Sequence, residues 1–373
     1  MDFIPVCEPF LNGNELKYVT EAVKTGWISS SGNYVREFEE SFARYCGVKF
    51  GVAVCNGTVA LHLAVVAAGI KPGDEVIIPN FTMVSTAFAL CYAGATPVFI
   101  DAEPGTWNMN ADAIEGKISP RTKAIMPVSI FGHPCEMERI WSLAEQYGLI
   151  VIEDAAESHG AEYKGKKTGS LADMTAFSFF SNKNLTTGEG GMVVTDNEEF
   201  YRKSTYFKNV CFPMEGPRNY RHEDIGFNYR MSNLHAALGV AQVEKANEYR
   251  ALRIRNGGLY RKYLEGIPGI SLQGSKSHVV HVFWMNGVLV DPERYGRTRD
   301  ELMSYLQKKN IETRLFFYGM HRQPSLLKYG CDGSGSYPVT DNLTNNGFYL
   351  PSSSSLREDQ ISYISDAIRE FHR

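Results

Sequence analysis

The sequence predicts an α/β protein in which a mostly parallel sheet is flanked by helices. Short apolar runs, each typical of a buried strand, alternate with helix-like segments through the first half of the chain. Such alternation indicates a parallel sheet, because neighbouring parallel strands are joined by crossovers that usually contain a helix. After about residue 232 the pattern changes to a long helix followed by mixed strands and helices, which predicts a second, smaller α+β domain.

The elements of the large domain follow from these runs in order. A strand from Phe50 to Val54 comes first, and the later strands are rich in Val, Ile and Phe, as buried strands usually are. We expect those later strands at 75–78, 97–100, 123–130, 149–153, 174–180 and 191–195. We expect helices between them at 58–69, 83–92, 111–118 and 135–147.

The large domain is expected at residues 1–240 and the small C-terminal domain at 241–373. The long helical pattern covers 232–264 and leaves room for one helix to bridge both domains. The later elements are expected as strands at 279–290 and 311–317, a helix at 299–309, and a last helix beginning near Ser355, where Ser355 and Glu358 fit a capping box.

Composition and charge exclude several classes of protein. Apolar residues make up 43% and charged residues 21% of the 373 residues, ordinary values for a folded globular chain. The net charge of −4 provides no basic excess for binding nucleic acid or a membrane surface. The seven cysteines are scattered without CxxC spacing, and the first residues lack a secretory signal. We therefore expect a reduced, cytoplasmic protein without a disulfide framework or a metal site.

Three polar segments follow expected strands, at the edge of the sheet where doubly wound folds bind their ligands. Gly57 and Thr58 begin a helix whose free N–H groups and dipole suit an anion. Asp154 follows one strand, and Lys183 follows another before a glycine-rich turn. A lysine in a partly buried apolar place loses proton affinity and becomes a usable nucleophile. Taken singly, these features also fit an ordinary helix cap, a loop acid and a surface lysine.

Together the three segments suit pyridoxal phosphate. The helix start would bind the 5′-phosphate, the carboxylate would keep the pyridinium nitrogen protonated, and the lysine would form the Schiff base. His159 is expected to be structural, and no His or Cys spacing indicates a metal site. The glycine fingerprint of dinucleotide-binding folds is missing, which disfavours an NAD-dependent dehydrogenase.

Six stretches carry a resemblance to a known family: 25–30 (Thr-Gly-Trp-Ile-Ser-Ser), 59–63 (Val-Ala-Leu-His-Leu), 132–135 (Gly-His-Pro-Cys), 177–180 (Phe-Ser-Phe-Phe), 186–195 (Thr-Thr-Gly-Glu-Gly-Gly-Met-Val-Val-Thr) and 228–231 (Asn-Tyr-Arg-Met). The chain resembles the DegT-type sugar-nucleotide aminotransferases, nearly end to end. The resemblance implies the aspartate-aminotransferase-like fold of type I. It also implies pyridoxal 5′-phosphate as cofactor, pyridoxamine phosphate in the half-reaction, and a homodimer with shared active sites.

The resemblance further implies roles for single residues. Lys183 matches the lysine that forms the Schiff base and then moves protons, and Asp154 matches the partner of the pyridinium nitrogen. Glu157 lies where many relatives have glutamine, near the 3′-oxygen, and Met83 lies where relatives often stack an aromatic ring on the cofactor. The matches for phosphate contacts are Gly57, Thr58, Ser178 and, from the neighbouring subunit, Asn228.

The reaction that the resemblance implies moves an amino group from L-glutamate to C4 of a 4-keto-6-deoxy sugar nucleotide, with GDP-4-keto-6-deoxymannose as the favoured acceptor. Lys183 supports amino transfer, since relatives that remove a hydroxyl group instead have histidine there. The open alternatives are amination at C3, a UDP- or dTDP-linked sugar, and a cofactor-binding regulator without turnover. Candidate residues for the nucleotide sugar are Trp27, Ser29, Arg230, Arg314, Tyr318, His321 and the insert 217–222, part of a segment that could cover the substrate.

Overall fold

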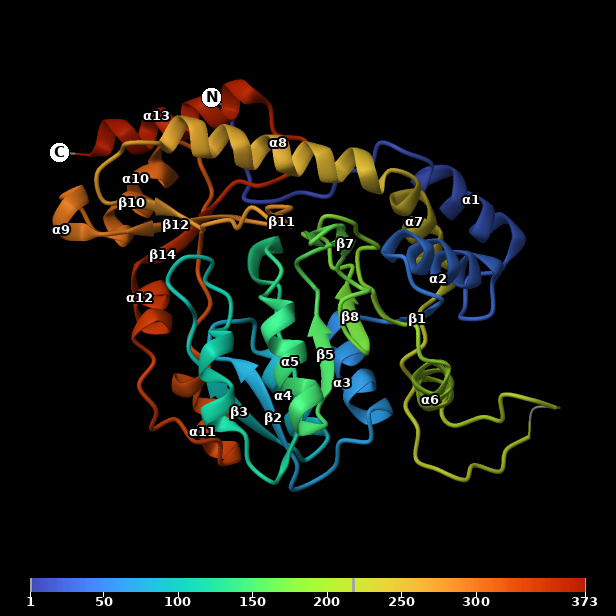
Figure 1. Ribbon diagram of the computed structural model, residues 1–373. Coiled ribbons are helices and arrows are strands. Elements are labelled where there is room, and N and C mark those ends of the chain that lie inside the picture. Colours follow the sequence, from blue (N-terminus) through green and yellow to red (C-terminus); the bar gives the residue numbers. More distant parts are fainter. Residues whose placement is uncertain (1, 217–218, 373) are drawn as a thin grey trace.

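The computed structural model describes residues 2–216 and 219–372 (Figure 1). Its largest sheet has seven strands in the order β1-β9-β8-β5-β4-β2-β3. Only β9 runs against its neighbours, so the predicted mostly parallel sheet is confirmed. The strands are β1 (Phe50–Val54), β2 (Glu75–Pro79), β3 (Thr96–Ile100), β4 (Thr122–Ile125), β5 (Ile150–Asp154), β8 (Met174–Ser178) and β9 (Gly191–Thr195).

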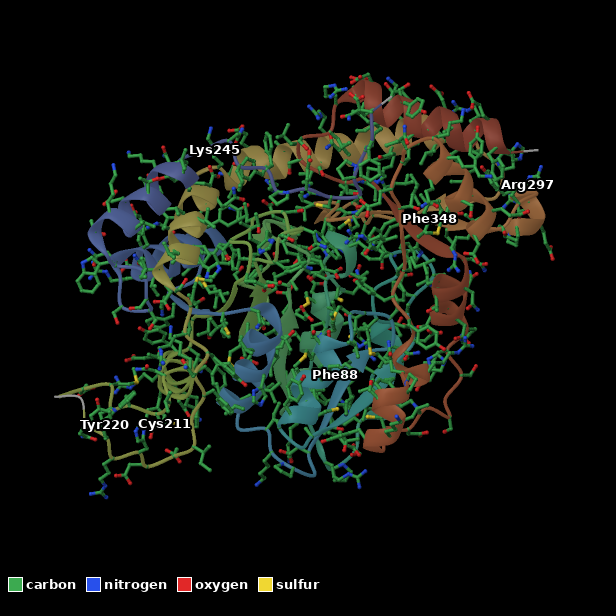
Figure 2. The ribbon with its side chains drawn as sticks, turned by 180° about the vertical axis from the view of Figure 1, so that it is seen from behind. Phe88, Cys211, Tyr220, Lys245, Arg297 and Phe348 are labelled. Atoms are coloured by element: carbon green, nitrogen blue, oxygen red, sulfur yellow. The ribbon has the colours of Figure 1, made fainter. Side chains whose placement is uncertain are left out.

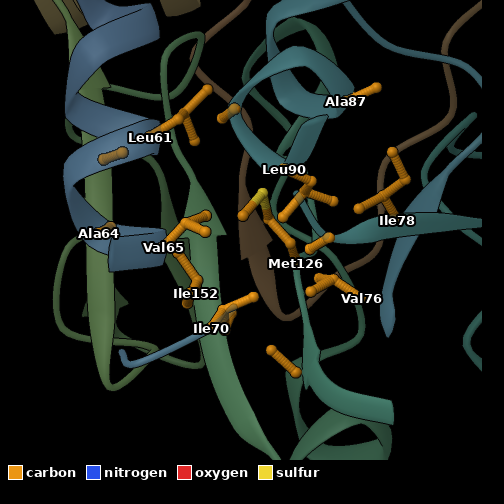
Figure 3. Close-up of a cluster of buried hydrophobic side chains, with 14 of the residues drawn as sticks. Leu61, Ala64, Val65, Ile70, Val76, Ile78, Ala87, Leu90, Met126 and Ile152 are labelled. Carbon is orange, nitrogen blue, oxygen red and sulfur yellow. The ribbon is translucent and has the colours of Figure 1, made fainter. Parts of the chain in front are cut away.

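Helices cover both faces of this sheet, and the alternation of side chains along each strand decides which helix a residue meets. Val76 and Ile78 of β2 belong to the core cluster beneath α3 and α4, which Figure 3 shows. Ile77, between them, points the other way and joins the core beneath α5. The helices of this part of the chain are α1 (Glu15–Thr25), which packs on α7, α2 (Asn33–Cys46), α3 (Gly57–Ala67), α4 (Ser85–Tyr92), α5 (Met137–Tyr147) and α6 (Glu198–Lys208).

A second, antiparallel sheet has the order β10-β12-β14-β13. It packs against α8 and α13, which lie side by side at the top of Figure 1. The two large sheets fall on opposite sides of residue 240 in the sequence, and the domain boundary there stays a prediction. The elements are α8 (Ala246–Leu264), β10 (Ile270–Leu272), β12 (Asn286–Val290), α9 (Pro292–Tyr295), α10 (Arg299–Lys308), β13 (Arg314–Leu315), α11 (Pro324–Tyr329), α12 (Pro338–Asn346), β14 (Gly347–Leu350) and α13 (Glu358–Phe371). A small sheet joins β6 (Glu162–Tyr163) to β7 (Lys166–Lys167) and β11 (Val279–Val280).

Several expected boundaries differ from the structure. The helical pattern over 232–264 is two helices, α7 (Asn233–Glu244) and α8, which break at Lys245. β4 ends at Ile125 rather than at residue 130, because Pro127 has no N–H to continue the ladder. The expected helix at 111–118 forms two short 3₁₀ turns, η1 (Ala111–Ala113) and η2 (Glu115–Lys117).

The C-terminal helix begins at Glu358, three residues later than the motif at Ser355 suggests. At this helix start the Gln360 side chain accepts a 3.1 Å hydrogen bond from the Arg357 N–H. The Ser355 hydroxyl instead donates a 2.8 Å hydrogen bond to Glu8, which ties the N-terminal segment to this end of the chain. A sequence motif of four residues does not reveal such a distant partner.

The segment between α6 and α7 projects from the body of the molecule, and Figure 2 labels Cys211 and Tyr220 on it. Tyr220 is 85% exposed. Pro217 and Arg218, which belong to the insert predicted to cover the substrate, lie outside the described residues. Within the part of the chain that the structure describes, no helix has the length and apolar content needed to cross a membrane.

Candidate active site

A cavity of about 530 Å³ opens at the carboxyl ends of the parallel strands. Asp154 is the last residue of β5, and Lys183 lies in the loop after β8, as the strand-end argument predicts. Residues from the second part of the chain close the opposite side: Trp284, Phe317 and Tyr349. The cavity therefore lies between the two large sheets.

Lys183 presents its amine to this cavity. The Nζ atom lies 3.7 Å from the centroid of the Trp284 ring. Burial lowers the pKa of Lys183, and the nearby charges of Glu157 and Asp154 act in the opposite direction. The amine is thus more easily deprotonated than that of a surface lysine, which is the property of a usable nucleophile and proton acceptor.

Asp154 is a buried carboxylate with a fixed orientation. One oxygen accepts a hydrogen bond of 2.8 Å from the Thr86 hydroxyl, and the other accepts one of 3.1 Å from the Ala156 N–H. Burial raises the pKa of Asp154, while these two hydrogen bonds and the charge of Lys183 lower it. Such a carboxylate can orient and stabilise a protonated ring nitrogen in the cavity.

Glu157 is a second buried carboxyl group at the same cavity. It accepts a 2.7 Å hydrogen bond from the Phe131 N–H. Burial raises the pKa of Glu157, and the charge of Lys183 lowers it. Phe131 has a φ of 53°, a left-handed conformation that aims its N–H toward the carboxyl group. Glu157 is thus held by the backbone of a distant loop.

The start of α3 is shaped to receive an anion. Gly57 is its first residue, and the Asn56 side chain accepts from the Val59 N–H at 3.0 Å. A Cβ at position 57 would lie 2.6 Å from the Ser178 Cβ, so only glycine fits this close approach. The Thr58 hydroxyl lies 2.8 Å from the Ser85 hydroxyl. Backbone donors, a helix dipole and three hydroxyl groups therefore meet in one place.

Besides Lys183, seven residues are predicted to contact the cofactor, and six of them line the cavity in this single chain. The structure brings Gly57, Thr58, Met83, Asp154, Glu157 and Ser178 together there with Lys183. Met83 is 48% exposed, and its sulfur accepts from the Ser85 N–H at 3.1 Å. Asn228 is not among the described lining residues and pairs with Asn209 at another place on the surface.

The residues expected to bind the nucleotide sugar lie elsewhere in this single chain. Arg230 lines a smaller polar pocket of about 290 Å³ with Ser30, Ser31, Lys208 and Asn209. Trp27 and Ser29 directly precede Ser30 and Ser31 of this pocket in the sequence. They are hydrogen-bonded to α7, because Asn233 donates from its side chain to the Trp27 carbonyl and from its backbone to the Ser29 carbonyl. These residues form one surface, distinct from the cavity around Lys183.

Three further substrate candidates come from the second part of the chain. Arg314 lies on β13 and contacts Glu312 at 3.4 Å. Tyr318 is about half exposed. His321 is buried, and its ring nitrogen lies 2.8 Å from the Asn80 side chain. None of the three belongs to the described lining of the cavity.

Sequence reasoning missed part of the cavity wall. Trp284, Phe317 and Tyr349 line it together with Ser85 and Asn182. Trp284 and Phe317 lie in the expected strands at 279–290 and 311–317, which the sequence presents only as core, and Tyr349 lies on β14, which was not expected. Ser85 could have been noticed, since a serine at a helix start after a strand repeats the pattern of Thr58.

Comparisons with known proteins agree with this geometry. Residues 9–369 match the DegT/DnrJ/EryC1/StrS aminotransferase family. The chain is 43% identical to GDP-perosamine synthase of Escherichia coli O157:H7 over 100% of this chain and 99% of that protein. It is also 43% identical to GDP-perosamine synthase of Caulobacter vibrioides, over 98% of this chain and 97% of that protein.

The fold is likewise shared with solved structures. The structure of DesI in the presence of its TDP-sugar product superimposes with a TM-score of 0.91 at 31% identity, covering 99% of this chain and 93% of that one. The expected fold class and enzyme class are therefore confirmed. The chain belongs to the DegT/DnrJ/EryC1/StrS aminotransferase family.

Proposed function

We propose that this aminotransferase moves the amino group of L-glutamate to C4 of GDP-4-keto-6-deoxymannose and so produces GDP-perosamine. The full-length similarity to two proteins named GDP-perosamine synthase supports the product. The observation that carries the chemistry is the amine of Lys183, which shares one cavity with the carboxyl groups of Asp154 and Glu157. We place the reaction in the cytoplasm, since all seven cysteines are free thiols.

The cavity fits pyridoxal 5′-phosphate, the cofactor of this aminotransferase. The start of α3, with Gly57, Thr58 and the Ser178 hydroxyl, would bind the phosphate. Asp154 would pair with the ring nitrogen, and Lys183 would hold the cofactor covalently. When bound, the cofactor supplies an electron sink and carries the amino group between donor and acceptor.

The chain's own residues have separate tasks in this reaction. The Lys183 amine accepts and returns the proton at the carbon that gains or loses nitrogen, because its lowered pKa makes it a good proton acceptor. Asp154 stabilises positive charge at the ring nitrogen from its fixed position at the end of β5. Trp284, Phe317 and Tyr349 exclude water from one wall, which strengthens these electrostatic interactions.

We also propose that two subunits share each active site. Asn228 and Arg230 lie outside the cavity of their own chain, on one surface with Trp27 and Ser29. Met83 and Trp27 are 48% and 58% exposed in a single chain, as residues covered by a partner would be. In this arrangement Asn228 binds the phosphate in the neighbouring subunit.

Mixing two impaired variants, at a cofactor concentration too low to saturate Asn228→Ala, tests the shared site. Lys183→Ala and Asn228→Ala are each expected to be impaired. In Asn228→Ala the loss of a hydrogen bond to the charged phosphate is expected to weaken cofactor affinity about 10- to 100-fold. After unfolding and refolding together, random pairing makes half of the dimers mixed with one intact site each, so we expect about a quarter of wild-type activity. Activity no greater than the sum of the separate variants would contradict a shared site.

The substrate is tested by direct assay. The purified enzyme with L-glutamate and GDP-4-keto-6-deoxymannose is expected to form the GDP-linked 4-amino sugar, detected by mass spectrometry. The similarity to DesI favours a TDP-linked sugar as the alternative acceptor. We expect kcat/KM for the GDP-linked sugar to exceed that for dTDP- and UDP-linked 4-keto-6-deoxyglucose by about tenfold or more. Equal or reversed values would refute the proposed acceptor but not the amino transfer.

A further inference from the structure

The amine of Lys183 and the ring of Trp284 form a contact between the two parts of the chain. The Nζ atom lies over the indole face, 3.7 Å from its centroid. Trp284 is buried and comes just before β12 of the second sheet, whereas Lys183 follows β8 of the first. Tryptophan gives the strongest cation–π interaction of the aromatic residues, and the interaction is stronger where water is excluded.

The indole is anchored to the loop that carries the lysine. Its Nε1–H donates a 2.9 Å hydrogen bond to the carbonyl of Asn182, the residue immediately before Lys183. The backbone of Trp284 is fixed as well, since its N–H donates to the Phe131 carbonyl at 2.9 Å and its carbonyl accepts from Arg253 at 3.1 Å. The ring edge and the ring face therefore contact adjacent residues of one loop.

Unusual backbone conformations hold this arrangement. Phe283, directly before Trp284, has a φ of 46°, and Phe131 has a φ of 53°. Phenylalanine rarely adopts the left-handed region, and such residues persist where the surrounding structure imposes them. The Phe283 ring is fixed by stacking on His281 at 3.9 Å. Phe131 links the two sides of the site, because its N–H contacts Glu157 and its carbonyl contacts Trp284.

We propose that Trp284 is a positioning residue whose indole face binds the protonated amine of Lys183 when that amine is not bonded to the cofactor. Lysine has a flexible four-carbon stem, and a free amine in a cavity of this size could otherwise turn toward Glu157 or Asp154. The ring face keeps the amine between the carboxyl groups and the aromatic wall, where it can return to its bonded position. That the contact forms when the amine is released from the cofactor rests on the proposed function, but the contact itself does not.

The proton affinity of Lys183 in the cofactor-free full-length chain tests the proposal. Competitive labelling with acetic anhydride across a pH series, with mass spectrometry of the Lys183 peptide, gives the pH at which the amine is half protonated. Trp284→Phe and Trp284→Leu both shrink the side chain and both lose the bond to Asn182, but only the phenylalanine variant keeps an aromatic face. We expect the leucine variant to bind the proton roughly three- to thirtyfold more weakly than the wild type, with the phenylalanine variant between them.

The matched control is Trp107→Leu, because Trp107 belongs to the same buried cluster as Trp284 but is not among the described residues that line the cavity. It is expected to leave the labelling of Lys183 unchanged. Equal labelling midpoints for the phenylalanine and leucine variants, or an equal shift in the Trp107 control, would overturn the proposal. If the leucine variant does not fold, Trp284→Met, which fills irregular space well, replaces it under the same criterion.

This experiment separates the present inference from the proposed function. The labelling uses neither cofactor nor substrate, so a difference between the phenylalanine and leucine variants supports the contact even if the sugar assay fails. Conversely, if the sugar is aminated and the two variants label alike, only the role of Trp284 is refuted. In the enzyme assay we expect the leucine variant to lower kcat more than it raises KM, since the ring positions a reacting group rather than binding substrate.

Discussion

Replacing Lys183 with alanine is expected to abolish amino transfer while the protein remains folded. The change removes the amine that would bond the cofactor and move the proton, and both tasks depend on the lowered pKa that burial gives it. We expect kcat to fall about 10⁴-fold or more, since the proton transfer and the covalent attachment are lost together. The measurement is formation of the amino sugar from L-glutamate, with circular dichroism to confirm the fold.

Two variants act as controls for this result. Lys183→Arg keeps a positive charge beside Asp154 and Glu157 but is always protonated, so it is also expected to be inactive. Lys166→Ala removes an exposed lysine of β7 and is expected to retain full activity. A second readout is borohydride reduction of the wild type followed by peptide mapping, which should place the reduced cofactor on Lys183. Its appearance on another lysine, or turnover by the alanine variant, would refute the assignment.

The part of the site that the sequence predicts is the part built from strand ends. Asp154 and Lys183 follow apolar runs, and parallel strands bring their carboxyl ends to one edge of a sheet. Gly57 marks the start of α3 at that same edge. Local patterns therefore suffice to place these residues near one another, without knowledge of how the rest of the chain packs.

The opposite wall could not be predicted in this way. Trp284 and Tyr349 belong to the second sheet, and only the packing of one part of the chain on the other brings them to Lys183. The left-handed backbone conformations of Phe131 and Phe283 could not be predicted from the sequence either, since phenylalanine normally avoids that conformation. Asn228 is predicted from the resemblance alone, and the role that we propose for it requires a second subunit.

Helix ends also show that a local sequence pattern cannot reveal contacts with distant residues. Thr298 and Glu301 form a capping box at the start of α10 through contacts three residues apart. The similar motif at Ser355 fails because its hydroxyl donates to Glu8 instead, at the far end of the sequence. A local motif decides the structure only where no distant group competes for the same hydrogen bonds.

Asp154→Asn is expected to lower kcat about 10²- to 10³-fold, the usual effect of removing one preorganised electrostatic contact. Asparagine fits the site, because its amide oxygen can accept from the Ala156 N–H and its NH₂ can donate to the Thr86 hydroxyl. The change therefore removes the negative charge with little change of shape. The cofactor should still attach to Lys183, so borohydride mapping is expected to resemble the wild type while amino sugar formation falls.

The neighbouring residue supplies a matched control for this prediction. Glu153 is also a buried carboxyl group of β5, but its side chain points to the other face of the sheet, where it accepts from the Ser129 hydroxyl at 2.7 Å. Burial raises the pKa of Glu153 to about 7, so Glu153→Gln also replaces a buried acid by its neutral amide. That variant is expected to keep kcat within about threefold of the wild type, because a group that does not face the cavity cannot contact the reacting atoms. An equal loss of kcat in the two variants would mean that the effect comes from disturbing β5 rather than from removing the charge of Asp154.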